Sequence, residues 1–559
     1  MRQQYEPSAD RIIALYQQLE DDILSAVIRR ILKMGYVSEA SKHQLKVLQA
    51  AGLLYDDIVQ LIADRTDACT AQVKALFEDA GVQTVEIDNS LHEAAGALPI
   101  DIRQDSSTRQ VLEAGYKKTL GTMQNLVSTT ATQTQTAFIQ TCDRIYMQVS
   151  SGAFSYQEAI MNALRALADT GAEVVYPTKH KDRMDVAVRR CVLTGVSQTA
   201  AAVSLQQAED AGCYLMEITA HSGARPDHAK WQGQLVTITG KDAGKIIDGL
   251  RVFTLSEIGY GSGEGFKGWN CRHNWHAYYP GFSTPNYTPE ELKKLDEPCI
   301  SYNGKLYTEY EVSQMQRAQE RRVRAWKRRC ITAQEGVNSA TDEATNAAAQ
   351  AEYSKSAVHL KANEEKLKDF CKQTGQNRDR FREQVYGFGR SEAQRAVQAN
   401  NSSFRNTMRQ KGIKNPPESI AEFKKMMYNK PDEYKLMQTY SKSVDSGMIS
   451  PLVGYEKYKE YHKRVEKELV GLTTSNGIEI KSQSDHFLER VFGTISDPTH
   501  EGAKRSGVEL EDIAEALKNG SVRQHKNGSY IYKSHNCEVS LNPNTGNLIQ
   551  VTPKKRNVP

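Results

Sequence analysis

Apolar residues at helical spacing dominate the first two hundred residues of this chain and constrain its fold more than any other feature. The clearest repeat recurs every three or four positions and comprises Ile12, Ile13, Leu15, Tyr16, Leu19, Ile23, Leu24, Val27, Ile28 and Ile31. Such spacing predicts an amphipathic helix with one buried face. Gly35 follows the repeat, as expected of a helix C-cap. We expect a second helix from Ser38, a third from about Tyr55 to Gly81, and loop-like structure over 82–105.

The helical character continues to residue 211 and returns after a polar interruption. Residues 106–150 are rich in Thr and Gln, which is typical of a helix that packs against partners rather than filling a core. Long charged helices are predicted over 286–400 and a helical connector over 401–471. The chain has 559 residues, more than one hydrophobic core normally serves, so several domains are expected. The predicted first domain is a helical body over 1–211.

Residues 212–285 interrupt the helical pattern with a polar block rich in Gly, His, Trp and Asp. A short apolar run at 213–220 predicts a strand, and the rest predicts irregular structure that is held by something other than a core. Five side chains offer nitrogen, sulfur or oxygen ligands for a structural zinc ion: His221, Asp227, His228, Cys271 and His273. Zinc favours such ligands, but Cys-x-His is not a common zinc-finger spacing. The alternatives are loop hydrogen bonds, with Asp227 paired to an arginine, and a hydrolase site.

A basic run follows at 320–329 within a predicted helix. Six cations fall within these ten residues: Arg321, Arg322, Arg324, Lys327, Arg328 and Arg329. Cations gathered on a helix can contact nucleic-acid phosphates and release counterions. The alternative is a solvated face, or one that pairs with the acidic residues at 364–366.

The last eighty residues predict a separate α+β module. Residues 472–485 look like a linker, and the module itself is expected over 486–556. Two short helices precede strand-like runs at 529–533, 537–541 and 547–551, and the segment Asn542–Gly546 predicts the loop of a hairpin. The predicted fold class is therefore a mainly α body with a small irregular α+β polar block, followed by a separate C-terminal α+β domain.

Other features limit where the chain works. The net charge is +4, so overall charge does not mark a nucleic-acid binder. The start of the sequence lacks a signal-peptide core, and apolar runs are too short for a membrane span. The nine cysteines are dispersed singly, which favours a reducing compartment over a disulfide framework. We therefore expect synthesis in a reducing cytosol and use without secretion, with no membrane partner.

Three stretches carry a resemblance to a known family. HSGARPDHAKWQGQ (221–234) and GYGSGEGFKGWNCRHNWHAYYPG (259–281) resemble the head-morphogenesis block, similar to Mu F, of the phage minor capsid protein 2 family. SYNGKLYTEYEVSQMQRAQERRVRAWKRR (301–329) is also similar. The resemblance covers roughly residues 1–400 and implies a virion structural protein near the portal that acts in head assembly, DNA packaging or ejection. Portal and major capsid proteins are the implied partners, with phage DNA as a partner of 320–329.

The C-terminal module resembles a second group, the Barnase/EndoU/colicin E5–D/RelE-like nucleases of phage and toxin proteins. The similar text is SDHFLERVFG (484–493), SGVELEDIAEALKNG (506–520) and YIYKSHNCEVSLNPNTGNLIQVTPKK (530–555). The resemblance implies metal-independent cleavage of RNA by a base, a phosphate-binding cation and an acid. The residues that would serve are His486, Arg490, Lys533, His535, Ser540 and Thr552. The alternatives are a non-catalytic module and, conversely, a phage-borne toxin whose main activity is this cleavage. A weaker alternative, an ADP-ribosyltransferase, lacks the expected motif.

Overall fold

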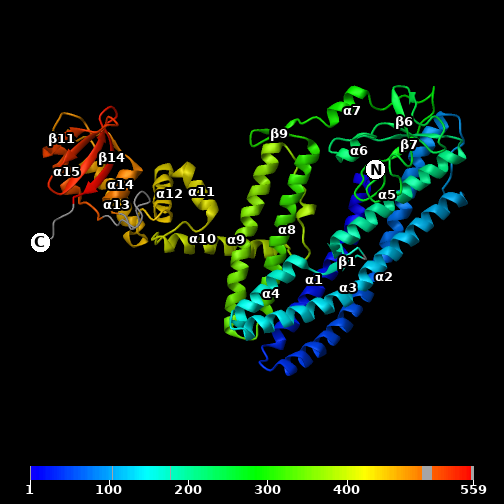
Figure 1. Cartoon of the computed structure of the whole chain (residues 1–559), viewed down its shortest axis with the longest axis horizontal. Helices are drawn as coiled ribbons and strands as arrows, with labels where there is room; N and C mark the ends of the chain where they lie inside the picture. The colour runs from blue at the N-terminus through cyan, green and yellow to red at the C-terminus, as the bar shows by residue number, and fades with distance from the viewer. Residues whose placement is uncertain (1, 103–104, 177, 494–505, 555–559) are drawn as a thin grey trace. The chain divides into compact units, whose positions relative to one another are not determined.

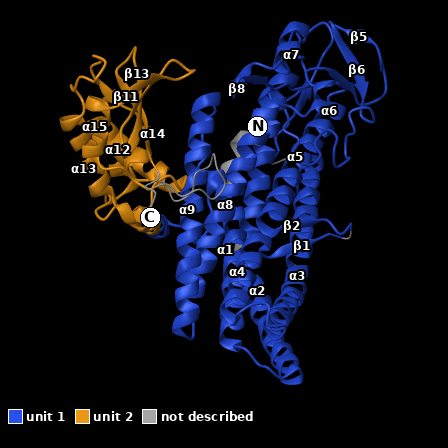
Figure 2. Ribbon diagram, turned by 60° about the vertical axis from the view of Figure 1, so that its left-hand side comes forward, with its two compact units in different colours: residues 1–397 blue, residues 398–559 orange. Residues whose placement is uncertain are grey.

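The computed structural model describes residues 2–102, 105–176, 178–493 and 506–554. It divides into two compact units, residues 1–397 (unit 1) and 398–559 (unit 2), coloured separately in Figure 2. The described part of the chain is mainly helical with small mixed sheets, which confirms the predicted fold class at that level. None of the helices in the described ranges combines the length and apolar character that crossing a bilayer requires.

Unit 1 begins with a body of long helices. Its elements are α1 (Arg2–Met34), α2 (Ala40–Ala94), α3 (Ser106–Ser150), α4 (Tyr156–Thr170), β1 (Glu173–Val175), β2 (Lys181–Arg183) and α5 (Met184–Asp210). The apolar repeat of α1 is buried as predicted, because its three- and four-residue spacing puts Ile12, Leu19 and Ile23 on one face. That face joins a continuous apolar core with α2 to α5. α1 ends before Gly35, whose φ of 64° suits the predicted cap.

The predicted break between a second and a third helix is wrong. One helix, α2, runs from Ala40 to Ala94 without interruption, so the loop-like structure expected from residue 82 begins only after Ala94. Gly81 lies inside this helix, and a Cβ there would meet the Leu112 side chain of α3 at 2.6 Å. The glycine therefore allows close helix packing, and does not end the helix.

The polar block forms a five-stranded sheet at one end of the helical body (Figure 1). Its elements are β3 (Leu215–Ile218), α6 (Pro226–Ala229), β4 (Leu235–Thr237), β5 (Ile246–Ile247), β6 (Leu250–Thr254) and β7 (Trp275–Ala277). The strand order is β5-β6-β4-β3-β7, with β4 and β6 parallel and the other pairs antiparallel. β3 lies next to β7, with Met216 opposite Ala277. β7 in turn packs against α5 and α2.

The rest of unit 1 returns to the helical body. Its elements are α7 (Pro289–Leu295), β8 (Ile300–Tyr302), β9 (Lys305–Tyr307), α8 (Glu309–Ser339), α9 (Glu343–Thr374) and the short helix η1 (Phe381–Glu383). The long charged stretch of the sequence is thus two helices, α8 and α9, which pack along each other and against α4. α8 also packs against α1, so segments distant in sequence complete the same body.

Unit 2 has a core of its own. Its elements are α10 (Arg390–Gln410), which begins before the boundary, α11 (Ile420–Asn429), α12 (Pro431–Asp445), η2 (Pro451–Val453), α13 (Tyr455–Glu468), β10 (Ser482–Gln483), α14 (Asp485–Val491), α15 (Leu510–Asn519), β11 (Ser521–Gln524), β12 (Tyr530–Lys533), β13 (Cys537–Asn542) and β14 (Asn547–Pro553). The sheet order is β10-β14-β13-β12-β11. The predicted hairpin joins β13 to β14, with Gly546 at a φ of 68°.

Residues 472–485 belong to this fold and do not form a free linker. Ile480 is fully buried, and Ser482 and Gln483 form β10, which pairs in parallel with β14. One apolar core contains Tyr440 and Tyr458 from the helices before this segment and Tyr532 from the sheet after it. The helical connector and the C-terminal sheet are therefore parts of one compact unit.

Candidate metal centre

Three of the predicted ligands meet in the polar block of unit 1. His228 lies in α6, and Cys271 and His273 lie in the segment that leads into β7. One potential ligand atom from each residue lies within 4.8 Å of the others, and all three residues are buried. Among the residues that the structure describes, this is the one such group of three His, Cys, Asp or Glu side chains.

A glycine-rich loop delivers Cys271 and His273 to the cluster. A Cβ on Gly265 would meet the carbonyl oxygen of Gly259 at 2.1 Å, and one on Gly268 would meet that of Gly263 at 2.3 Å. The loop therefore packs against its own backbone at distances that only glycine tolerates. Asn270, just before Cys271, adopts a φ of 57°, a left-handed turn that Asn accepts better than most residues.

Hydrogen bonds fix the histidine rings around the cluster. His273 Nε2 lies 3.3 Å from the side-chain oxygen of Gln232, which also accepts from the backbone nitrogen of His221 at 3.2 Å. His228 Nε2 lies 2.8 Å from the carbonyl oxygen of Glu264, which also accepts from the guanidinium of Arg225. Partners of this kind orient the ligands of metal sites and select the ring nitrogen that faces the metal.

His221 and Asp227, the other two predicted ligands, differ in position. The ring of His221 stacks on that of His273 with centroids 4.5 Å apart. Its Nδ1 lies 2.9 Å from the Ser222 carbonyl oxygen, while its Nε2 is buried with no hydrogen-bond partner. Asp227 has a half-exposed side chain whose carboxylate lies 3.7 Å from Arg225 Nε. Asp227 thus pairs with an arginine, as the alternative interpretation expected.

Burial keeps the histidines of the cluster neutral. It lowers the pKa of His221 and of His228, and lowers the pKa of His273 to about 2, with further contributions from the neighbouring His221 and His228. A buried imidazolium would carry its charge away from water at a large free-energy cost. Neutral imidazole is the form that binds metal ions.

The donor set fits a tetrahedral ion. Cys271 Sγ and His273 Nδ1 lie 3.6 Å apart. Two ligands at the usual Zn–S and Zn–N distances on a tetrahedron would be separated by about 3.5 Å. The ring of His221, whose Nε2 is buried without a hydrogen-bond partner, stacks on that of His273 but lies outside the group of three whose ligand atoms come within 4.8 Å. The residues present therefore suit Zn²⁺, which prefers mixed nitrogen and sulfur ligands.

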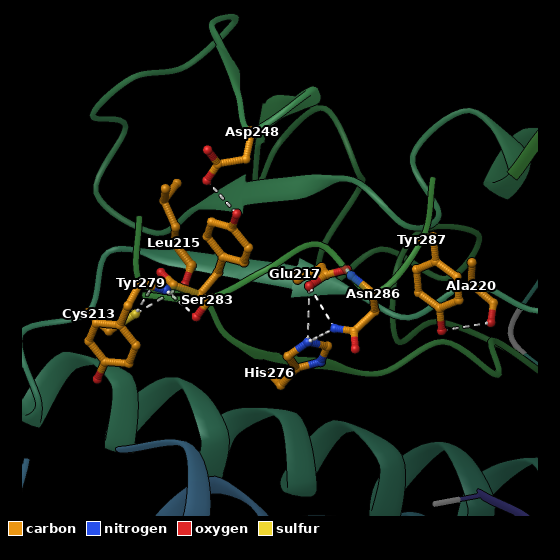
Figure 3. A network of polar contacts seen from close by, with 11 residues as sticks. Cys213, Leu215, Glu217, Ala220, Asp248, His276, Tyr279, Ser283, Asn286 and Tyr287 are labelled. Atoms are coloured by element: carbon orange, nitrogen blue, oxygen red, sulfur yellow. Dashed lines mark hydrogen bonds and ion pairs between the residues drawn. The ribbon is translucent and has the colours of Figure 1, made fainter. Parts of the chain in front are cut away.

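The sequence analysis missed a second polar network in this block, shown in Figure 3. The carboxylate of Glu217, which is 1% exposed on β3, accepts from the backbone and side-chain nitrogens of Asn286 at 2.9 and 2.8 Å. His276 Nε2 lies 3.3 Å from the same carboxylate. The hydroxyl of Tyr287 donates to the carbonyl of Ala220 at 3.2 Å. These contacts fasten the segment after the sheet to β3.

The structure divides the cations of the basic run between the body and the surface. Arg328 pairs with buried Asp185 at 3.0 Å, and Arg329 makes two hydrogen bonds to Asp169 at 2.9 and 2.7 Å. Lys327 donates to the carbonyl of Glu383 at 2.8 Å. Burial lowers the pKa of Arg324. Arg321 and Arg322 are exposed, so these two remain accessible as predicted phosphate contacts.

The predicted nuclease residues of unit 2 fall into two groups. On α14, Arg490 Nε lies 3.4 Å from His486 Nε2, and His486 Nδ1 lies 3.4 Å from Glu489. Lys533 lies 3.4 Å from Glu538, whose cross-strand neighbours are Lys533 and Thr552. Because β13 alternates buried and half-buried positions, Glu538 and Ser540 share the sheet face opposite to the buried one. His535 is exposed in the turn between β12 and β13.

Similarity to known proteins defines the class of this chain. The model of the family described as phage minor capsid protein 2 matches residues 2–372, which include the helical body and the polar block. More than half of the chain is matched, and the chain therefore belongs to this family of virion structural proteins. The resemblance noted in the sequence is confirmed for this part.

Two relatives are described as structural proteins. The one from Lactococcus phage LL-H is 24% identical over 333 residues, which cover 57% of this chain and 86% of that protein. The one from Lactococcus phage mv4 is 37% identical over 81 residues, which cover 14% of this chain and 57% of that protein. No solved structure matches the chain.

Proposed function

We propose that this minor capsid protein acts near the portal during head assembly or DNA packaging, with portal and major capsid proteins as partners. One observation carries the proposal: the family match covers the helical body together with the polar block and ends before unit 2. The body and the block therefore form the part that the family shares. Because the family match does not reach unit 2, we expect head assembly not to require it.

Co-purification with the portal protein and, separately, with the major capsid protein tests this proposal. We expect the full chain and a chain ending at residue 397 to bind the portal protein equally well. Deletion of the polar block, residues 212–285, should abolish that binding. Binding that requires unit 2, or binding to the major capsid protein alone, would contradict a portal-proximal role of the body.

We also propose that the polar block binds a structural zinc ion through His228, Cys271 and His273, with His221 or water as the fourth ligand. When bound, the ion would supply cross-links between α6 and the segment before β7 that the small apolar core of the block does not provide. Gln232 and the Glu264 carbonyl would hold two of the ligand rings. Asp227 is left out of the site because its carboxylate pairs with Arg225.

Metal content of the purified chain tests the zinc site. We expect about one zinc per chain in the parent, a large loss in Cys271→Ser, and no loss in Cys299→Ser, since Cys299 is exposed and distant from the cluster in sequence. EDTA should lower the melting temperature of the parent and of Cys299→Ser but not of Cys271→Ser. Equal metal content in all three proteins, or the same melting temperature for the parent with and without EDTA, would refute the site.

A second function is favoured by the pairing of His486 with Arg490 on α14. We propose that unit 2 cleaves RNA without a metal ion, with His486 as base and Arg490 as phosphate-binding cation. The half-exposed ring of His486 lies beside both a carboxylate and a guanidinium. Lys533, His535, Ser540 and Thr552 stay predicted residues of this activity, but Lys533, Ser540 and Thr552 lie on the sheet face opposite to the apolar core that α14 joins. A toxin or effector role would rest on this activity.

An RNA-cleavage assay of the full chain in EDTA tests this second function. The expected result is cleavage by the parent and by His525→Ala, an exposed control between β11 and β12, and none by His486→Ala. A lack of cleavage by the folded parent would leave unit 2 without this activity. Equal cleavage by all three proteins would show that His486 is not the base.

A further inference from the structure

A lysine and an asparagine side chain meet inside the polar block of unit 1. Lys267 belongs to the glycine-rich loop and is 4% exposed, and Asn274 directly precedes β7 and is 8% exposed. The Nζ of Lys267 donates to the Oδ1 of Asn274 at 2.8 Å. Lysine is almost never buried to this extent. The pair therefore differs from the ordinary lysine contacts of a protein surface.

Hydrogen bonds fix the backbone of both residues. The carbonyl oxygen of Lys267 accepts from the side chain of Gln198 on α5 at 3.1 Å. Asn274 exchanges two bonds with Thr219: its backbone nitrogen donates to the Thr219 hydroxyl at 2.9 Å, and its carbonyl accepts from the Thr219 nitrogen at 2.8 Å. Lys267 also has a φ of 61°, a left-handed conformation that is strained for a lysine. Such strain is found where the surrounding structure holds a functional group in one position.

The two side chains are close enough to react with each other. A C=O bond is about 1.2 Å long, so Nζ lies within about 4 Å of the Asn274 Cγ. The last torsion of an asparagine is only loosely restricted, and a small rotation would turn the face of the amide towards Nζ. Burial disfavours the ammonium form of a lysine and so favours the neutral, nucleophilic amine. An amine that is held beside a carbonyl carbon reacts as if it were present at very high concentration.

We propose that Lys267 and Asn274 join through an intramolecular amide bond. The lone pair of the neutral Nζ forms a bond to Cγ, and the π electrons of the carbonyl move to Oδ1. When the carbonyl forms again, the bond from Cγ to Nδ2 breaks. The hydroxyl of Ser197, 3.2 Å from Nζ, accepts a proton from Nζ and gives one to Nδ2, which leaves as ammonia.

The reaction balances without any further reactant. The ammonium form of Lys267 first releases one proton to water, and the ammonia that leaves takes up one proton there. The product is an uncharged amide, so the cost of keeping a cation away from water disappears. The new bond closes a ring of residues 267–274, which contains the proposed zinc ligands Cys271 and His273. The cross-link would fix this loop independently of any metal.

The mass of the full chain, measured after reduction in denaturant and EDTA, tests the proposal. We expect the parent to be lighter than its sequence by one ammonia. Lys267→Arg should have the full mass of its own sequence, because a guanidinium stays protonated and is no nucleophile. Lys305→Arg, at an exposed position on β9, is the matched control and should lose ammonia as the parent does. A parent with the full mass of its sequence would overturn the proposal, and this result does not depend on whether a variant folds.

A tryptic digest locates the bond. Trypsin cleaves after free lysine and arginine side chains, so it should leave Lys267 uncut and still cleave after Arg272. The parent should then yield residues 252–272 joined to residues 273–293, whereas Lys267→Arg should release residues 252–267. Loss of ammonia together with cleavage after Lys267 would place the loss at another asparagine, as in a cyclic imide, and would refute the cross-link.

The rate of ammonia loss tests the role of Ser197. In chains labelled by a pulse of heavy isotope, Ser197→Ala should become cross-linked at least about tenfold more slowly than the parent, because the proton relay is missing. Ser313→Ala, at a partly buried position on α8, is the control and should react at the rate of the parent. Equal rates in Ser197→Ala and the parent would overturn the assignment of Ser197 as the relay.

Discussion

At the scale of single residues, the helical body contains a buried group of charges where α1, α5 and α8 meet. Glu20 of α1 pairs with Arg183, and Asp185 of α5 pairs with Arg328 of α8. These carboxylates are 2% and 3% exposed. The mutual attraction of two buried opposite charges offsets much of the cost of removing them from water, whereas a single charge left behind is costly. Arg328 is therefore a structural residue of the core.

Asp21 lies at the edge of this group and makes the stability of the body depend on pH. Burial, together with the nearby Glu20, raises the pKa of Asp21 to about 8. In the folded chain the Asp21 carboxyl therefore keeps a proton that it releases near pH 4 in the unfolded chain. The contribution of protonated Asp21 to the unfolding free energy is complete below pH 4 and is lost as the pH rises to 8. At pH 8 we expect the unfolding free energy of Asp21→Asn to be about 1–3 kcal/mol higher than that of the parent, and its denaturant midpoint to be higher as well. The difference should shrink towards pH 4.

Denaturant titrations between pH 4 and 9 provide the measurement for Asp21. Arg183 and Arg328 lower the pKa of Asp21 and Asp185 raises it, so the arginines oppose the effect of burial. Asp79→Asn, at an exposed position on α2, is the control and should follow the parent at every pH. A parent whose unfolding free energy does not fall above pH 5 would contradict this assignment.

At the scale of elements, α8 combines two roles along one short basic run. Arg328, Arg329 and Lys327 contact other parts of unit 1, whereas Arg321 and Arg322 are exposed about two turns earlier. A solvated helix face that carries all six cations, one of the alternatives that the sequence leaves open, is therefore excluded by the buried pair of Arg328. Arg321 and Arg328 are seven residues apart and therefore share a face of the helix, so the two groups are separated along the helix axis, by about 10 Å, and not by direction.

Substitution in α8 separates these roles. We expect Arg321→Ala/Arg322→Ala to weaken binding to double-stranded DNA and to reduce the slope of log affinity against log salt by about 2, with no change in melting temperature. Arg328→Ala should instead lower the unfolding free energy by about 3–5 kcal/mol, because Asp185 would be left buried and unpaired. Filter binding at several salt concentrations and thermal melting are the measurements. An unchanged salt slope in the double variant would exclude Arg321 and Arg322 as phosphate contacts.

How far a pattern can be predicted from sequence depends on how local its cause is. The burial of Ile12 and Ile23 and the hairpin ending at Gly546 follow from neighbours within a few residues, and both predictions are confirmed. The pairing of Arg328 spans 143 positions to Asp185, and no local signal reports it. The contact by which Gln232 orients the His273 ring could not be predicted either, because a single Gln beside a Gly occurs in many loops and forms no motif. The zinc ligation, DNA contact and RNA cleavage stay predictions.

At the scale of the whole molecule, the chain consists of two units with separate apolar cores. The core of unit 1 draws on helices α1 to α5 and on α9. That of unit 2 includes Tyr440, Tyr458 and Phe487, three of the largest fully buried side chains of the chain. A segment with an apolar core of its own is expected to fold as an independent unit.

Calorimetry of the whole chain and of a chain that ends at residue 397 tests this independence. We expect two unfolding transitions for the whole chain and one for the shorter chain, with the shared transition at the same temperature in both. Trypsin at low concentration should release a stable fragment that corresponds to unit 2. A single transition in the whole chain, or a body that unfolds at a lower temperature when unit 2 is missing, would show that the units depend on each other.

The order of strands in unit 2 has a consequence for the timing of synthesis. β14 lies inside the sheet, between β10 and β13, although it is the last strand in sequence. The ribosome must therefore release residues 547–553 before the sheet can close, while the body has been complete since α9. Domains generally fold in the order in which they emerge. A nascent chain thus presents a finished capsid body while its second unit is still unfolded, so early contacts with other head proteins can form before unit 2 acquires any activity.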